Sequence, residues 1–172
     1  MEEEVVLVDV RDNQLGTAPK LQAHREGRLH RAISVFLFNP AGEMLLQRRA
    51  GGKYHSAGLW SNACCSHPRP GEQPHAAAIR RLQEEMGIAA PLDYAFSFVY
   101  KAELESGLWE HELDHVFVGT STEIPSPDAS EVGEWRWTSV DEVEAELERE
   151  PSSFTVWFPL AFRELRRRTG GR

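Results

Sequence analysis

The chain has 172 residues, a length that suits one domain with its own hydrophobic core and leaves little room for a second. Its formal net charge of -8 excludes nonspecific binding to nucleic acid or to an anionic membrane surface, because phosphate groups would repel that field. Charged residues at 27% and hydrophobic residues at 41% exclude a disordered or fibrous chain. We therefore expect a single domain over 1–172, with a core of about 30–165.

The amino terminus lacks the positive and apolar regions of a secretory signal, and no later apolar run approaches the length of a membrane span. The two cysteines, Cys64 and Cys65, are adjacent. Adjacent cysteines close only a strained ring, so we expect free thiols. Together these features predict a cytoplasmic protein. One core accounts for the apolar stripes, which favours a monomer.

Six short segments rich in β-branched and aromatic residues predict strands. They are 5–8, 33–38, 44–48, 96–100, 113–118 and 135–137. The sequence Asn-Pro-Ala-Gly at 39–42 predicts a hairpin turn between the second and third strands.

One helix is predicted between the third and fourth strands. Ile79, Leu82 and Met86 recur there at helical spacing. Pro74 suits the first helical turn and Gly87 the C-terminal cap, so we expect the helix to lie between them.

Two more amphipathic helices are predicted near the C-terminus, at about 140–148 and about 154–168. We expect Pro159 to interrupt the second, because proline lacks the backbone N–H that a helix interior needs. The order of elements is mostly strands, one central helix, more strands and then helices. This order predicts an α+β fold, an α/β/α sandwich.

The segment 60–68 places thiols beside an imidazole. In an extended backbone Cys65 and His67 share one face, while Cys64 points to the other. A thiol next to an imidazole is useful for acid–base chemistry. Free cysteines are nevertheless more often inert core residues, and we assign Cys64 to that class.

Carboxylates form a row near the fifth predicted strand. Glu110 and Glu112 alternate in a strand register and share one face, and Asp114 continues the row. Like charges on one face repel, and a shared cation is the usual relief, although a solvated strand face without a metal fits equally well. His111 and His115 face the other way, so we do not expect them to be ligands.

Two histidines, His24 and His30, flank a polar stretch before the strand at 33–38. Taken alone, this pair is better explained as exposed loop histidines. With His67 and the two glutamates, however, imidazole nitrogens join hard carboxylate oxygens. This mixture suits divalent Mn, Zn, Fe or, less comfortably, Mg.

The central helix carries charges whose spacing has two interpretations. A solvated helix face explains the pairs Arg80/Glu84 and Arg81/Glu85 at i,i+4. The set nevertheless resembles the Nudix box, the diphosphate-handling helix of that superfamily, in residues Glu72, Arg80, Leu82, Glu84, Glu85, Gly87 and Ile88.

The resemblance to the Nudix box is incomplete at two positions. The box has glycine where this chain has Ser66, and glutamate where it has Arg81. The missing glutamate normally belongs to the catalytic helix of the hydrolases. Its loss argues against hydrolysis and for a relative that kept the fold.

Motifs spread over about 5–160 are similar to those of type I isopentenyl diphosphate isomerase. They are Leu29-His30-Arg31-Ala32, Phe36-Leu37-Phe38-Asn39, Gln47-Arg48-Arg49-Ala50, Trp60-Ser61-Asn62, Cys65-Ser66-His67-Pro68 and Glu110-His111-Glu112. The resemblance implies a Nudix-like fold, with a mixed β-sheet core flanked by helices. It also implies conversion of isopentenyl diphosphate to dimethylallyl diphosphate in isoprenoid biosynthesis, through a tertiary carbocation.

The resemblance implies two metal sites and a diphosphate site. One Mn²⁺, Mg²⁺ or Zn²⁺ ion would be caged by five residues, namely His24, His30, His67, Glu110 and Glu112. A second ion, Mg²⁺, would arrive with the diphosphate and be held by Glu85. The basic residues that grip the diphosphate match Lys20, Arg49 and Lys53, each of which alone reads as an ordinary surface charge.

The resemblance also implies the acid–base groups. Cys65 and Glu112 would lie on the two faces of the alkene, with Tyr100 helping to deliver a proton. Trp157 would cover the hydrocarbon tail and stabilise developing positive charge. Taken alone, Tyr100 reads as an ordinary strand aromatic and Trp157 as core packing.

Two other functions remain open from the sequence. A Nudix-type pyrophosphohydrolase would use Arg80, Glu84 and Glu85, but Arg81 does not fit it. A noncatalytic metal-binding or diphosphate-binding module would not need the Cys65 thiol together with the five cage residues. The sequence thus favours an isomerase that acts on a small-molecule diphosphate.

Overall fold

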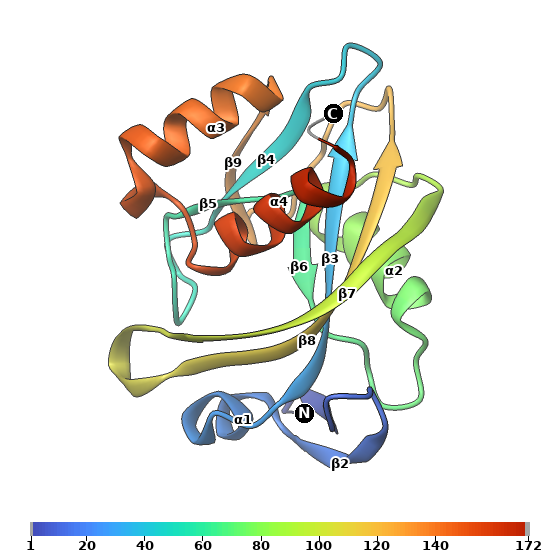
Figure 1. Ribbon diagram of the computed structural model, residues 1–172, viewed down its shortest axis with the longest axis vertical. Helices are drawn as coiled ribbons and strands as arrows, with labels where there is room; N and C mark the ends of the chain where they lie inside the picture. Colours follow the sequence, from blue (N-terminus) through green and yellow to red (C-terminus); the bar gives the residue numbers. More distant parts are fainter. Residues whose placement is uncertain (1, 171–172) are drawn as a thin grey trace.

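The computed structural model describes residues 2–170, so residue 1 and residues 171–172 of the predicted domain lie outside the described residues. Nine strands of the described chain form one mixed sheet (Figure 1). They are β1 (Glu4–Val8), β2 (Gln14–Pro19), β3 (His30–Phe38), β4 (Met44–Arg49), β5 (Trp60–Ser61), β6 (Cys64–Ser66), β7 (Leu92–Glu103), β8 (Trp109–Thr120) and β9 (Val132–Thr138). The helices are α1 (Lys20–Glu26), α2 (Pro74–Met86), α3 (Val140–Arg149) and α4 (Trp157–Arg168), with short 3₁₀ turns η1 (Glu105–Gly107) and η2 (Pro151–Ser153).

Strand β3 organises the sheet, because it pairs in parallel with β8 and antiparallel with β6. The parallel register sets His30 opposite Glu112, and the antiparallel register sets Ser34 opposite Cys65. The β7–β8 hairpin sets Tyr100 opposite Glu112. Backbone pairing alone therefore brings polar residues from four distant segments to the same part of the sheet.

The two faces of β3 enter different cores. Ile33, Val35 and Leu37 belong to the core under α2, whereas Phe36 belongs to the core under α3 and α4. Successive residues of a strand point to opposite faces, which explains this division. Each large apolar side chain buried in this way contributes roughly 2 kcal/mol to folding. Helices thus cover both sides of the sheet (Figure 1), and the predicted α/β/α sandwich is confirmed.

Helix α2 lies where the sequence predicts it. It begins at Pro74 and ends before Gly87, whose φ of 67° is the left-handed conformation that favours glycine. Leu82 and Met86 are fully buried, as expected from their spacing. Ile79, which belongs to the same repeat, is 38% exposed.

Helix α4 differs from the prediction at its start. It begins at Trp157 rather than near residue 154, and a 3₁₀ turn precedes it. Pro159 is therefore in the first turn, where a backbone N–H has no helical partner, and it does not interrupt the helix.

Helix α1 was not expected. It has seven residues, no side-chain cap at its start, and ends at Gly27 with φ of 66°. So short a segment has too few apolar repeats to be read as helical. Strands β7 and β8 also extend several residues beyond the predicted ones. None of the helices within 2–170 has the length and apolar composition needed to span a bilayer.

Candidate active site

Four buried residues converge at the start of β3. His24 from α1, His30 from β3, His67 just after β6 and Glu110 from β8 each place one possible ligand atom within 4.8 Å of the others. The side chains of His24 and His30 are fully buried, so the interpretation as exposed loop histidines is wrong. The structure brings these four predicted cage residues together.

Backbone carbonyls orient two of the imidazoles. His24 Nδ1 donates to Lys20 O at 2.7 Å, and His30 Nδ1 donates to Arg28 O at 2.9 Å. Because a carbonyl only accepts, each Nδ1 carries a proton, so Nε2 is the nitrogen that can present a lone pair to a cation. Metal-ligating histidines are held in this way by a partner on the second nitrogen.

Glu112 connects this group to a phenol. Its Oε2 lies 2.8 Å from His67 Nε2 and 3.2 Å from His30 Nε2. Its Oε1 accepts a hydrogen bond from the Tyr100 hydroxyl. The fifth predicted cage residue therefore also contacts the predicted proton-delivering tyrosine.

The pKa values of Glu110 and Glu112 are shifted in opposite directions. Burial, together with the charge of Glu112, raises the pKa of Glu110 well above its usual range. Burial also opposes the charge on Glu112, but the adjacent imidazoles of His30 and His67 outweigh it and hold the pKa of Glu112 well below its usual range. Burial lowers the pKa of His67 to about 4. The imidazole is neutral at neutral pH, as a metal ligand must be.

Three polar atoms of the cage have no hydrogen-bond partner among the residues described. They are His30 Nε2, His67 Nδ1 and Glu110 Oε2, and all three are buried. Buried polar atoms are nearly always satisfied, so two orphaned nitrogens and an orphaned oxygen in one group indicate a missing partner. A divalent cation would accept their lone pairs and relieve the repulsion between Glu110 and Glu112. The residues present fit such an ion.

Cys65 lies on the same face of the sheet and makes several polar contacts. Its Sγ donates to Asn62 Oδ1 at 3.0 Å and accepts from Trp157 Nε1 at 3.3 Å. Burial, with a smaller effect from Asp114, raises the pKa of Cys65 to about 12. The thiol therefore holds its proton at neutral pH and can act as a proton donor.

An apolar cluster surrounds the thiol. Tyr100, Leu104, Leu108 and Trp157 are buried together, and Cys65 packs against them. The neighbouring aromatics of α4, by contrast, stack within the separate core under α3 and α4. Trp157 therefore packs in a different cluster from the other aromatic residues of α4, so the apolar stripe of that helix does not account for it.

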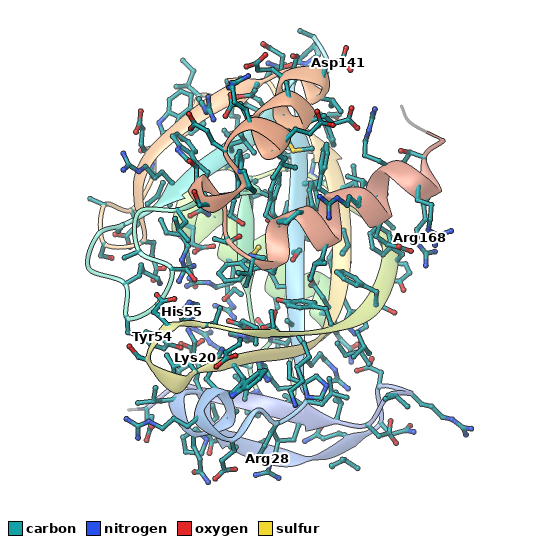
Figure 2. All side chains as sticks on the ribbon, turned by 60° about the vertical axis from the view of Figure 1, so that its left-hand side comes forward. Lys20, Arg28, Tyr54, His55, Asp141 and Arg168 are labelled. Atoms are coloured by element: carbon teal, nitrogen blue, oxygen red, sulfur yellow. The ribbon has the colours of Figure 1, made fainter. Side chains whose placement is uncertain are left out.

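A cavity joins the cage, the thiol and a set of charged side chains. Figure 2 shows Lys20, Tyr54 and His55 gathered at this side of the molecule, above α1. The three predicted diphosphate residues line the cavity, as do the predicted catalytic thiol, the helix glutamate and the indole. The lining residues are Glu3, Lys20, Arg49, Lys53, His55, Cys65, Ser66, His67, Arg81, Glu85, Glu110, Glu112, Glu131 and Trp157.

Cations and carboxylates of the cavity pair with one another. Lys53 Nζ lies 2.6 Å from Glu131 Oε2, and Arg81 Nη2 lies 3.4 Å from Glu85 Oε1 and 3.7 Å from Glu131 Oε1. Arg49 lies over the Trp157 ring, with 5.3 Å from Cζ to the ring centroid. An entering anion would therefore find basic groups already held at the cavity wall.

Sequence reasoning missed several cavity residues, among them Arg81 and His55. The sequence indicates Arg81 as a helix-face partner of Glu85 and as a departure from the Nudix box, but not as a residue of the cavity. His55 is buried in a loop, with Nε2 3.5 Å from Glu110 Oε1, and burial lowers its pKa to about 3. No periodicity marks a loop residue, so sequence offered no signal for His55.

The two histidines expected to face away from the cage do so. His111 Nδ1 donates to Gly27 O at 2.9 Å and secures the end of α1. His115 Nε2 lies 3.0 Å from Asp12 Oδ2 on the far side of β8.

Solved structures share this fold. A crystal structure of DR0079 from Deinococcus radiodurans superposes with a TM-score of 0.80 and 18% identity, covering 95% of this chain and 99% of that one. The MutT protein from Methanosarcina mazei Go1 gives a TM-score of 0.68 and 23% identity, covering 82% of this chain and 95% of that one. At these identities the likeness concerns the fold alone.

Sequence comparisons are more specific. Residues 28–158 match the NUDIX domain family. Isopentenyl-diphosphate Delta-isomerase 2 of Aromatoleum aromaticum is 50% identical, over 91% of this chain and 83% of the relative. The isopentenyl-diphosphate Delta-isomerases of Serratia proteamaculans and Burkholderia multivorans are 48% and 51% identical, over 96% and 92% of this chain and 92% and 90% of theirs. The chain therefore belongs to the NUDIX domain proteins and, among them, to the isopentenyl-diphosphate Delta-isomerases.

Proposed function

We propose that this chain converts isopentenyl diphosphate to dimethylallyl diphosphate by adding one proton and removing another. One observation carries this proposal. A partly buried thiol, Cys65, and a carboxylate, Glu112, line one cavity that also has basic residues in its wall, and Tyr100 donates a hydrogen bond to that carboxylate. The names of relatives that are about half identical to this chain support the same reaction.

The reaction needs two acid–base groups. A proton adds to the terminal methylene carbon of the alkene, and the electron pair of the double bond forms the new C–H bond. This leaves a tertiary carbocation at the branched carbon. Loss of a proton from the neighbouring chain methylene returns an electron pair and forms the new double bond. An unactivated alkene is a poor base, so the acid must be closely placed.

In this proposal Cys65 is one of the two groups and Glu112 the other. Burial raises the pKa of the Cys65 thiol, so the thiol releases its proton only to a base in direct contact with it. Glu112 accepts from the Tyr100 hydroxyl, which gives that side of the cavity a proton route through the phenol. Tyr100 therefore works with Glu112 as the third catalytic residue.

Five residues would hold one divalent ion in the cage, which we propose to be Mn²⁺, Mg²⁺ or Zn²⁺. They are His24, His30, His67, Glu110 and Glu112. When bound, such an ion would fix Glu112 in place and make it a stronger proton donor when protonated. The orphaned atoms of His67 and Glu110 support this assignment.

Basic groups would receive the diphosphate. Lys20, Arg49 and Lys53 line the cavity, and we propose that they bind the phosphate oxygens. A Mg²⁺ ion that enters with the substrate would contact Glu85, which is 3% exposed and lines the same cavity. Charge-assisted contacts of this kind would hold the alkene in position during proton transfer.

Trp157 would cover the hydrocarbon part of the substrate. Its ring belongs to the apolar cluster around Cys65 and its N–H contacts the thiol. An aromatic face next to a developing carbocation contributes roughly 1 to 2 kcal/mol.

Hydrolysis is less well supported by the charges of the cavity. Arg81 occupies the position where the Nudix box has a glutamate, and it pairs with Glu84 and Glu85 at 2.6 Å and 3.4 Å. The helix therefore lacks one of the carboxylates that would hold the metal ions required for hydrolysis. The cytoplasmic location, the monomeric state and a role in isoprenoid biosynthesis stay predictions.

Nuclear magnetic resonance of the reaction in deuterated water tests the proposal. Purified protein with Mg²⁺ and isopentenyl diphosphate should yield deuterated dimethylallyl diphosphate, while the phosphorus signals of the diphosphate persist. Release of phosphate would instead establish a pyrophosphohydrolase. Unchanged alkene and phosphorus spectra would leave a noncatalytic binding module.

Glu112→Gln tests the double role proposed for Glu112. The variant should bind less metal after purification and isomerise more slowly, because an amide neither carries charge nor transfers the proton. Metal content by elemental analysis and turnover of the same sample measure both effects. Full metal content with full activity would refute the assignment.

A further inference from the structure

The two adjacent cysteines face different parts of the molecule. Cys65 lines the cavity, whereas Cys64 is fully buried in the core that α2 forms with the sheet. Strand β6 causes this division, because successive side chains of a strand alternate between faces. The register sets Cys64 opposite Val35, which belongs to the same core. Only this much was expected from the sequence, which assigned Cys64 to inert packing.

Cys64 is not surrounded by apolar groups alone. Its Sγ donates a hydrogen bond to Glu85 Oε2 at 2.6 Å. The other oxygen of the same carboxylate, Oε1, lies 3.4 Å from Arg81 Nη2. Glu85 is thus held by two partners, a thiol from the core side and a guanidinium one turn earlier on α2.

This arrangement fixes the direction of a buried carboxylate. Glu85 is 3% exposed and lines the cavity, so water gives it little support. A buried carboxylate requires hydrogen-bond donors to remain in one orientation. Alanine or valine would fill the space of Cys64 but provide no donor. The thiol therefore has a consequence beyond packing.

We propose that Cys64 is a positioning residue that aims the Glu85 carboxylate at the metal ion accompanying the diphosphate. This proposal rests on the function proposed above, in which Glu85 contacts that ion. Cys64 touches neither substrate nor metal. It acts through Glu85, as the outer partners of other metal-binding carboxylates do.

Calorimetric titration of Mn²⁺ into the full chain, with inorganic pyrophosphate present, tests the proposal without turnover. Glu85→Gln identifies the binding step that depends on Glu85. Cys64→Ala should weaken that step about tenfold, the usual lower range for loss of an outer partner. Cys64→Ser should retain most of the affinity. A C–O bond is shorter than a C–S bond, so the serine hydroxyl would lie slightly farther from Glu85. The sulfur is only 2.6 Å from Glu85 Oε2, so the hydroxyl would still lie within hydrogen-bond distance.

Val35→Ala is the matched control for loss of packing. It removes apolar atoms from the same core, opposite Cys64, and Val35 does not line the cavity. It should lower the melting temperature but leave the Mn²⁺ isotherm unchanged. Equal weakening by Val35→Ala and Cys64→Ala would overturn the proposal, because packing would then explain both.

The outcomes separate this inference from the proposed function. If Glu85→Gln weakens Mn²⁺ binding and Cys64→Ala does not, the role of Cys64 is wrong and that of Glu85 stands. If Glu85→Gln changes nothing, both roles are wrong. Isomerisation itself is measured separately, by the alkene signals of the wild-type reaction, and its absence would reject the proposed function.

Discussion

The two ends of strand β3 are equally buried and chemically opposite. His30 at its start and Phe36 near its end are both fully buried. Phe36 stacks on Phe158 with ring centroids 6.2 Å apart, whereas the His30 ring lies 5.0 Å from that of His67 in a group with orphaned polar atoms. Burial of Phe36 stabilises the fold, while burial of His30 and its neighbours is unfavourable until a cation completes the group. Buried, unsatisfied polar atoms, and not burial itself, therefore mark the site.

Cys65→Ala should have the largest effect and should change activity alone. Loss of one of two acid–base groups is expected to slow isomerisation by about 10⁴-fold, equivalent to about 5.4 kcal/mol. The melting temperature and the metal content should match those of the wild type. Turnover near the wild-type rate would contradict the role proposed for Cys65.

Phe36→Ala should lower the stability of the fold and leave the activity unchanged. Removing a fully buried phenylalanine ring leaves a cavity, and the free energy of unfolding should fall by about 3 to 5 kcal/mol. Denaturant unfolding measures this loss. The rate per folded molecule should stay close to the wild type, because Phe36 lies outside the cavity. Phe36→Leu is the control and should cost much less.

Added metal should stabilise the whole protein by binding at the polar end of β3. At a free Mn²⁺ concentration 100 times the Kd, the free energy of unfolding should rise by about 2.7 kcal/mol. For a chain of this size the melting temperature should rise by roughly 5 to 10 °C. Glu110→Gln is the control, because it removes a cage carboxylate. An equal rise in that variant would show that Mn²⁺ binds elsewhere.

Trp157→Phe should have the smallest effect, and it tests the contribution of the indole N–H. Phenylalanine keeps an aromatic face but loses the N–H that donates to Cys65 Sγ. The turnover number should fall roughly fivefold, which corresponds to a rise of about 1 kcal/mol in the activation free energy. Trp157→Leu removes the aromatic face as well, so it should be slower than Trp157→Phe. Equal rates for the two variants would argue against a contact with the carbocation.

The sequence predicted the elements whose patterns are long and regular. Helix α2 has a proline start, a glycine end and an apolar repeat, and β3 is a long run of apolar and β-branched residues. Helix α1 is too short to show a period, and Pro159 was misread because the start of α4 is set by a preceding 3₁₀ turn. Boundaries of this kind depend on tertiary packing rather than on local pattern.

The candidate site was predicted by residue type and resemblance, but its geometry was not. Strand alternation placed Glu110 and Glu112 on one face, and both line the cavity. Nothing in the sequence showed that His30 would stand opposite Glu112, because parallel pairing depends on the whole sheet. The contacts of Arg81 with Glu131, of His55 with Glu110 and of Cys64 with Glu85 also depend on the tertiary structure.

The parallel pairing of β3 with β8 has a consequence for biosynthesis. His24 and Glu110 are 86 residues apart in the chain, and β8 is among the later strands to be made. During translation the amino-terminal half would leave the ribosome with His24, His30 and His67 but with neither cage carboxylate. Long-range strand pairing of this kind forms slowly. The cage therefore cannot be complete before β8 pairs with β3, and an ion that binds the finished cage would stabilise this late, long-range part of the sheet.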